Sequence, residues 1–133
     1  MRVSGRRVVG GYAEGDALVS PEPVSFYGGI DPETGIVTEL DHCLCGQSVS
    51  GRVFAFPTGK GSTVGSYVIY RMKKLGTAPA AIINEATEAI IVTGCVLAGV
   101  PLIDRLEDGH FELLRTGSYV KVYGHEGFIE VSS

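Results

Sequence analysis

A glycine-rich segment in the middle of the chain carries the residues best suited to chemistry. It reads Thr58-Gly-Lys-Gly-Ser-Thr63 and joins an apolar, β-type run, Arg52–Phe56, to a segment of helical spacing. Glycines let backbone amides approach a ligand, and the N–H groups and dipole of a helix start attract an anion. Amides and a nearby cation also stabilise an ionised hydroxyl, which a serine needs to act as a base. The segment therefore predicts a site for an anionic group, with Ser62 as the candidate base.

The neighbours of this serine are candidates for supporting roles. Lys60 and the amides of Gly61 and Thr63 are expected to stabilise the Ser62 oxygen or a substrate anion. The structural alternative is that Ser62 or Thr63 only caps the helix that follows. A nucleotide-binding P-loop is excluded, because Phe54 stands where that motif needs its first glycine and Gly61 follows the lysine.

A second glycine-rich turn lies nearer the N-terminus, within Phe26–Gly35. Gly28, Gly29 and Asp31 are candidates to line the cleft that receives substrate and partner. The alternative is a purely structural turn, since Asp-Pro followed by glycine is typical of a type I turn.

Cysteines and histidines give weaker signals. Cys43 and Cys45 form a C-x-C pair, but one such pair without a second cluster rarely makes a tetrahedral metal site. We expect packed free thiols and no metal bound by this chain. The three histidines, His42, His110 and His125, are expected on the surface or in turns, and no Ser-His-Asp triad is assignable.

Composition excludes several classes of protein. The chain has 133 residues, 44% hydrophobic and 20% charged, which predicts one globular domain over 1–133. A net charge of -4, a pI near 5.3 and the lack of a basic stripe argue against nucleic-acid binding. No window approaches the roughly 20 apolar residues of a membrane span, so we expect a cytoplasmic protein without a membrane partner.

The expected elements form a strand-rich α/β domain with few helices. One helix is expected over 64–74, ending near Gly76, and a short helical turn over 85–88. Short apolar strands beside a helix predict parallel pairing in the middle of the sheet and antiparallel pairing at its ends. The expected strands are 1–12, 16–20, 36–37, 52–56, 80–83, 89–92, 100–103, 119–123 and 128–131.

Several segments together resemble a known family. Phe56–Tyr70 is similar to the signature of the small subunit of the aconitase X family, and Phe26–Gly35, Ala78–Ile83 and Thr93–Asp104 fit as well. The resemblance implies a swivelling β/β/α domain, like the mobile fourth domain of aconitases. It also implies a separate large aconitase-like subunit that carries an iron–sulfur cluster on its own cysteines.

The same resemblance implies a reaction. In this family the serine of the glycine-rich loop accepts a proton, and that role falls on Ser62. The implied activity is that of a hydro-lyase, active only with its large subunit, on a small anionic hydroxy acid. The reaction that the resemblance implies is dehydration of (R)-5-phosphomevalonate to trans-anhydromevalonate 5-phosphate, in the archaeal mevalonate route to isoprenoids.

Three alternatives remain open at this point. Another hydro-lyase of the same family would dehydrate cis-3-hydroxyproline with the same paired domains. A protein of a different class would be a non-catalytic swivelling module that binds an anion. A self-sufficient esterase is disfavoured, because the chain lacks a G-x-S-x-G elbow.

Overall fold

The computed structural model describes residues 1–132, which form eight strands, two α-helices and one 3-10 helix. Within these residues no helix is both long and apolar enough to cross a membrane. In chain order the elements are β1 (Arg2–Ser4), β2 (Arg6–Val9), β3 (Tyr12–Val19), β4 (Val53–Phe56), α1 (Gly65–Leu75), β5 (Ala81–Asn84), α2 (Ala89–Ala98), β6 (Leu102–Asp104), η1 (Glu107–Leu113), β7 (Tyr119–Tyr123) and β8 (Phe128–Ser132).

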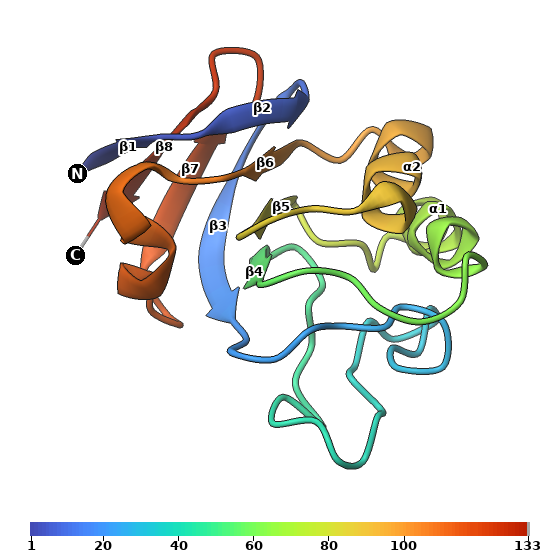
Figure 1. Ribbon diagram of the computed structural model, residues 1–133. Helices are drawn as coiled ribbons and strands as arrows, with labels where there is room; N and C mark the ends of the chain where they lie inside the picture. The colour runs from blue at the N-terminus through green and yellow to red at the C-terminus, as the bar shows by residue number, and fades with distance from the viewer. Residues whose placement is uncertain (133) are drawn as a thin grey trace.

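The strands form a single sheet that closes on itself. Their order is β1-β8-β7-β3-β4-β5-β6-β2, so β1 and β2 stand at the two ends of the sheet. In the chain these two strands are separated only by Gly5, and they therefore join the two ends into a barrel (Figure 1). The neighbours from β3 to β6 are parallel and the remaining pairs are antiparallel, which confirms the predicted arrangement.

Two apolar cores follow from the alternation of side chains along the strands. On β4, Val53 and Ala55 belong to the core inside the barrel, which small and β-branched residues fill. Phe54 and Phe56 point the other way, into a second core beneath α1 and α2. Both helices lie on one side of the barrel, and η1 lies across the barrel from them (Figure 1).

The prediction for residues 85–92 is wrong. Residues 89–92 were expected to form a strand and 85–88 a helical turn, but 89–92 begin α2 and the preceding segment is not helical. The β-branched run Ile90-Ile-Val92 favours a strand locally. The carboxylate of Glu88 overrides that preference because it accepts hydrogen bonds from the amides of Ile90 and Ile91, both at 3.0 Å, and caps the helix.

The helices approach each other closely at one glycine. A Cβ on Gly94 of α2 would lie 2.5 Å from Cδ1 of Ile69 on α1. A glycine lowers the helix propensity of α2, but it allows α1 and α2 to pack closely at this point. The long connection from β3 to β4 completes this core, and there the predicted strand at 36–37 is reduced to isolated bridges.

A buried carboxylate links the barrel closure to the loop after β5. Asp104, at the end of β6, accepts hydrogen bonds from Nε and Nη2 of Arg6 at 2.8 Å and from the Thr87 amide at 2.9 Å. Burial by itself raises the pKa of Asp104, but these hydrogen bonds and the charge of Arg6 outweigh it and hold the pKa below its ordinary value. The ionised form therefore stabilises the fold.

We expect Asp104→Asn to lower the free energy of unfolding at pH 7 by about 2 kcal/mol, the contribution of a charge-assisted hydrogen bond. Arg6 is half-exposed, and solvent screening limits the effect to that size. Because the folded pKa lies below the unfolded value of about 3.9, the stabilisation is present above that value and is lost as pH falls through the folded pKa. Urea unfolding from pH 7 to pH 2.5 should show the two proteins converging in acid; a constant difference would contradict the assignment.

Candidate functional site

The glycine-rich loop after β4, residues 58–63, is called here the serine loop. It is held on one side by the segment after β3: the Val24 amide donates to the Thr58 carbonyl at 3.2 Å, and the Lys60 amide donates to the Val24 carbonyl at 3.0 Å. These bonds form an isolated parallel bridge between Val24 and Gly59, which holds the loop in place.

Glycine is required at two positions of the serine loop. A Cβ on Gly59 would collide with the Glu88 carboxylate that caps α2. Gly61 has φ +91°, and its Cβ would lie 2.5 Å from Oγ of Ser25. The backbone of the serine loop thus lies between the start of α2 and the segment after β3. Contacts on both sides fix the position of Ser62.

Ser62 is exposed at the tip of this clamped loop, directly before α1. Its Oγ accepts a hydrogen bond from the Val64 amide at 3.2 Å, an amide that the sequence pattern did not single out. The helix N-cap position is Val64, without a side-chain cap. Ser62 nonetheless accepts the amide two residues ahead, as a capping serine does, so a capping role and a role as base are both compatible with this geometry.

The amides of Gly65 and Ser66, the first two residues of α1, are engaged within the chain. The Gly65 amide donates to the Ser62 carbonyl at 2.9 Å and the Ser66 amide to the Thr63 carbonyl at 3.3 Å. The Ser66 hydroxyl also donates to the Thr63 carbonyl, at 3.0 Å. An anion at this helix start would be attracted by the helix dipole and by side-chain charge, and these two amides are already engaged.

Lys60 forms an ion pair with Glu39, a residue that the sequence pattern did not indicate. Its Nζ lies 3.2 Å from Oε2 of Glu39, and both side chains are partly exposed. The pairing bridges two loops far apart in sequence, so no local motif signals it. An exposed ion pair of this kind contributes little to stability and exchanges partners easily, which leaves Lys60 able to turn to an incoming anion.

The predicted glycine turn lies beside the start of α1, but two of its three candidates have structural roles. A Cβ on Gly29 would collide with the Ser25 carbonyl, so Gly29 is required for the turn to close. Oδ1 of Asp31 accepts the Glu33 amide at 3.0 Å within its own turn. Gly28, with φ +82°, is exposed and lines a hollow at the base of α1.

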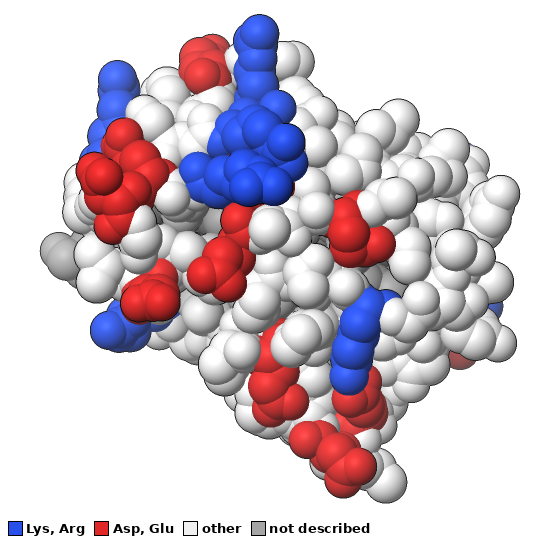
Figure 2. Space-filling model, viewed as in Figure 1, with Lys and Arg blue, Asp and Glu red and all other residues white. Residues whose placement is uncertain are grey.

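Apolar surface surrounds the serine loop on the helical side. The hollow between the glycine turn and α1 has a volume of about 380 Å³. A second hollow of about 350 Å³ lies between α1 and α2, and Tyr67, whose exposed fraction is 67%, borders both. Figure 2 shows that the surface over α1 and α2 is almost free of charge, whereas charged side chains gather over the rest of this view. Such a patch is typical of an interaction site.

The three cysteines do not form a site for an iron–sulfur cluster. Cys95 is buried in the helical core, and this burial raises the pKa of its thiol to about 12. Cys43 and Cys45 were expected to be packed thiols, but both are exposed. Such a cluster requires several thiolates at one place, and residues 1–132 do not bring three cysteines together. The cysteines of the described residues therefore do not fit an iron–sulfur cluster.

Turns or partly exposed positions hold the histidines, as expected, but His42 is in addition buried. His125 is exposed in the turn between β7 and β8, and His110 is part of η1. His42 is in a turn but buried, and its Nε2 lies 3.1 Å from the Pro23 carbonyl oxygen. The hydrogen bonds found for these histidines in the described chain do not involve Ser62, which agrees with the lack of a triad.

Comparisons with known proteins agree along nearly the whole chain. The profile of the aconitase X swivel domain matches residues 2–131. The protein of Methanosarcina acetivorans named phosphomevalonate dehydratase small subunit is 50% identical over 131 residues, 98% of this chain and 91% of that protein. The protein of the same name from Thermococcus onnurineus is 51% identical, with 98% of each chain covered. The crystal structure of Thermococcus kodakaraensis aconitase X in its holo form matches with a TM-score of 0.95 and 46% identity, over 100% of this chain and 99% of that one.

Proposed function

The chain belongs to the aconitase X swivel domain family, and from this premise we propose that it is the small subunit of a two-chain hydro-lyase. We propose (R)-5-phosphomevalonate as its substrate and trans-anhydromevalonate 5-phosphate as its product, a step of the mevalonate pathway. The names of relatives about 50% identical over 98% of the chain support this substrate. The observation that carries the proposal is Ser62, exposed at the tip of a clamped loop beside an apolar face. Three free thiols fit a reducing compartment, and we place the complex in the cytoplasm.

The contribution of this chain to the reaction is a base. Dehydration of a β-hydroxy acid removes a proton from the carbon next to the carboxylate and hydroxide from the following carbon, and a double bond forms between the two. The ionised Oγ of Ser62 takes that proton. The Val64 amide stabilises the negative oxygen, and Lys60 adds positive charge when it leaves Glu39.

The iron–sulfur cluster expected for such a hydro-lyase belongs, in this proposal, to the large subunit. The cysteines of the described chain do not converge and supply none of its ligands. Base and cluster then reside on different chains, so neither chain alone is the enzyme. Closure of the swivelling domain onto the partner completes the site around the substrate and excludes water.

We propose that the large subunit docks on the helical face, defined as Val64, Tyr67, Ile90, Thr93 and Val96. Every residue of α2 is uncharged, yet Val96 keeps an exposed fraction of 61%. A helix that is apolar all round is normally buried on all sides. The helical face also adjoins Thr63 of the serine loop, so a partner seated there comes next to Ser62.

The test is reconstitution. This chain is mixed anaerobically with its large subunit and (R)-5-phosphomevalonate, and the unsaturated product is followed by mass spectrometry. We expect turnover by the mixture and none by either chain alone. Turnover of cis-3-hydroxyproline instead would overturn the substrate. A complex that forms without turning over either compound would favour the non-catalytic anion-binding module.

A further inference from the structure

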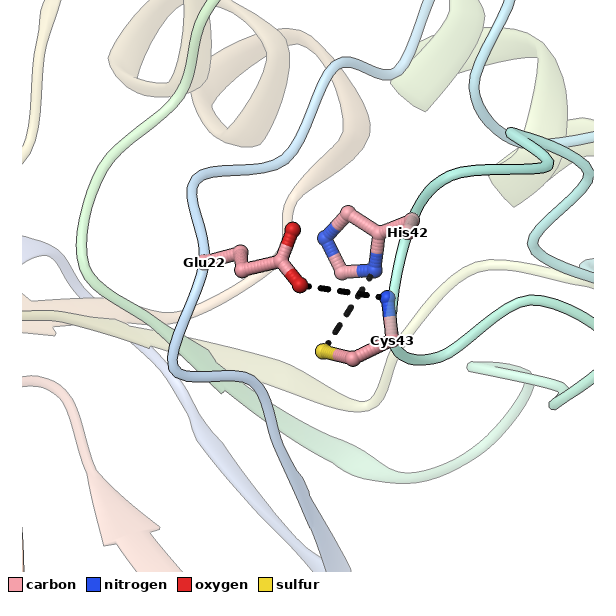
Figure 3. Close-up of side chains that lie close together, drawn as sticks. All are labelled: Glu22, His42 and Cys43. Atoms are coloured by element: carbon pink, nitrogen blue, oxygen red, sulfur yellow. Dashed lines mark hydrogen bonds between the residues drawn. The ribbon is translucent and has the colours of Figure 1, made fainter.

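Three potential metal ligands from two loops converge beside the serine loop. Glu22 comes from the segment after β3, whereas His42 and Cys43 come from the turn that follows Glu39. One ligand atom from each, a carboxylate oxygen, a ring nitrogen and Sγ, lie within 4.8 Å of one another, and the ring nitrogen nearest Cys43 Sγ is Nδ1. Figure 3 shows the three side chains pointing toward one another, with the dashed contacts joining Glu22 to the Cys43 amide and Cys43 Sγ to His42.

The tautomer of His42 suits metal binding. A carbonyl oxygen only accepts, so the 3.1 Å contact with Pro23 requires the proton on Nε2. Nδ1 then carries the lone pair, which the Leu44 amide contacts at 3.1 Å. Metal-binding histidines characteristically donate their second ring N–H to a backbone carbonyl or a carboxylate, which orients the ring. Burial of His42 fixes the ring in this orientation.

The other two ligands are accessible and already linked. The Cys43 amide donates a hydrogen bond to Oε1 of Glu22 at 3.3 Å, which holds the two residues side by side. Cys43 is exposed and Glu22 half-buried, so an ion can enter from solvent. Prolines on both sides of Glu22 limit the freedom of its backbone.

The spacing and chemistry of the three groups match zinc. Bonds of about 2.3 Å to sulfur and about 2.0 Å to nitrogen at a tetrahedral angle place those two atoms about 3.5 Å apart. The observed separation between Cys43 Sγ and His42 Nδ1 is 3.9 Å. We propose that Glu22, His42 and Cys43 form a zinc site, in which zinc displaces the thiol proton and replaces the Leu44 amide at Nδ1. Three protein ligands leave the fourth position to water.

The site would brace the serine loop from behind. Glu22 precedes Val24 by two residues, and Val24 is the residue whose backbone holds Thr58 and Lys60. Zinc would tie this segment to the turn that carries Glu39, the partner of Lys60. The ion therefore fixes both neighbours of the loop without contacting substrate.

Zinc titration of the reduced, metal-free full chain tests the site, with Cys45→Ser as the matched control for Cys43→Ser. Cys45 is also exposed and lies two residues away, but it does not belong to the three-ligand group. We expect wild type and Cys45→Ser to bind one zinc ion per chain, with release of protons and a rise of several degrees in Tm. Cys43→Ser should bind at least about 100-fold more weakly, since even loss of an outer partner costs about 10–100-fold.

Cobalt provides a second readout that is independent of dehydratase activity. Co²⁺ should give a thiolate-to-cobalt charge-transfer band in wild type and Cys45→Ser but not in Cys43→Ser, and Glu22→Gln should weaken binding of both metals. Circular dichroism establishes that each variant is folded. Absence of stoichiometric binding, equal affinity in Cys43→Ser, or loss of the band in Cys45→Ser would each overturn the proposal.

Discussion

Replacement of Ser62 by alanine is expected to lower kcat of the reconstituted complex by about a thousandfold, the usual contribution of a positioned base. The hydroxyl is exposed and donates to no other residue described, so its loss leaves the clamped backbone of the serine loop unchanged. Exchange of the substrate's α-hydrogen in D2O should fall in parallel with the dehydration rate, because both require the same proton transfer. Anaerobic steady-state kinetics and NMR measure the two quantities.

Ser66→Ala is the matched control for this variant. Ser66 lies one turn further along, and its hydroxyl is engaged with the Thr63 carbonyl at 3.0 Å. Its loss should change kcat by less than about tenfold, the effect of one ordinary hydrogen bond. If Ser62→Ala kept a kcat within tenfold of wild type in an intact complex, Ser62 would not be the base.

A charge in the middle of the helical face should separate the subunits. We expect Tyr67→Glu to weaken the affinity for the large subunit by about 100-fold, because tyrosines in the centre of an interface often contribute more than 2 kcal/mol. Tyr67 borders both hollows of the helical face, and no residue of α2 could pair with a buried carboxylate there. The cation one turn further on α1, Arg71, already pairs with Glu33 at 3.6 Å. Titration calorimetry with the large subunit measures the change.

Leu113→Glu controls for the effect of the charge itself. Leu113 has an exposed fraction of 55% and belongs to η1, across the barrel from the helices (Figure 1). It should bind the large subunit as tightly as wild type, and saturating Tyr67→Glu should recover most of kcat. Equal weakening by both variants would refute docking on the helical face.

Those parts of the fold that local patterns determine were predictable. A continuous apolar run predicts the buried strand at 53–56, and alternation of apolar and polar residues predicts the hairpin at 119–132. α2 was mistaken for a strand because Ile90-Ile-Val92 favours β structure locally, while its cap and its packing on Ile69 are tertiary facts. Barrel closure by β1 and β2 depends on pairings with β8 and β6, which no local window contains.

For the candidate site, the sequence singled out Ser62 but not its surroundings. Ser62 stood out through the glycine-rich loop and the family resemblance. The Val64 amide, the Lys60–Glu39 pair and the buried His42 depend on how distant loops meet. Gly29 and Asp31 were assigned to a cleft because turn-forming residues and ligand-binding residues are of the same types, and their contacts show the former role.

Closure of the barrel by the first strands has a kinetic consequence. Val3 of β1 pairs with Ile129 of β8, far away along the chain. Folding must therefore join segments separated by nearly the whole sequence, and domains dominated by such contacts fold slowly. β1 has no partner until β8 is made, whereas β2 can already pair with β6. Until then the barrel is open, and β1 is an unpaired edge that strands of other chains can join.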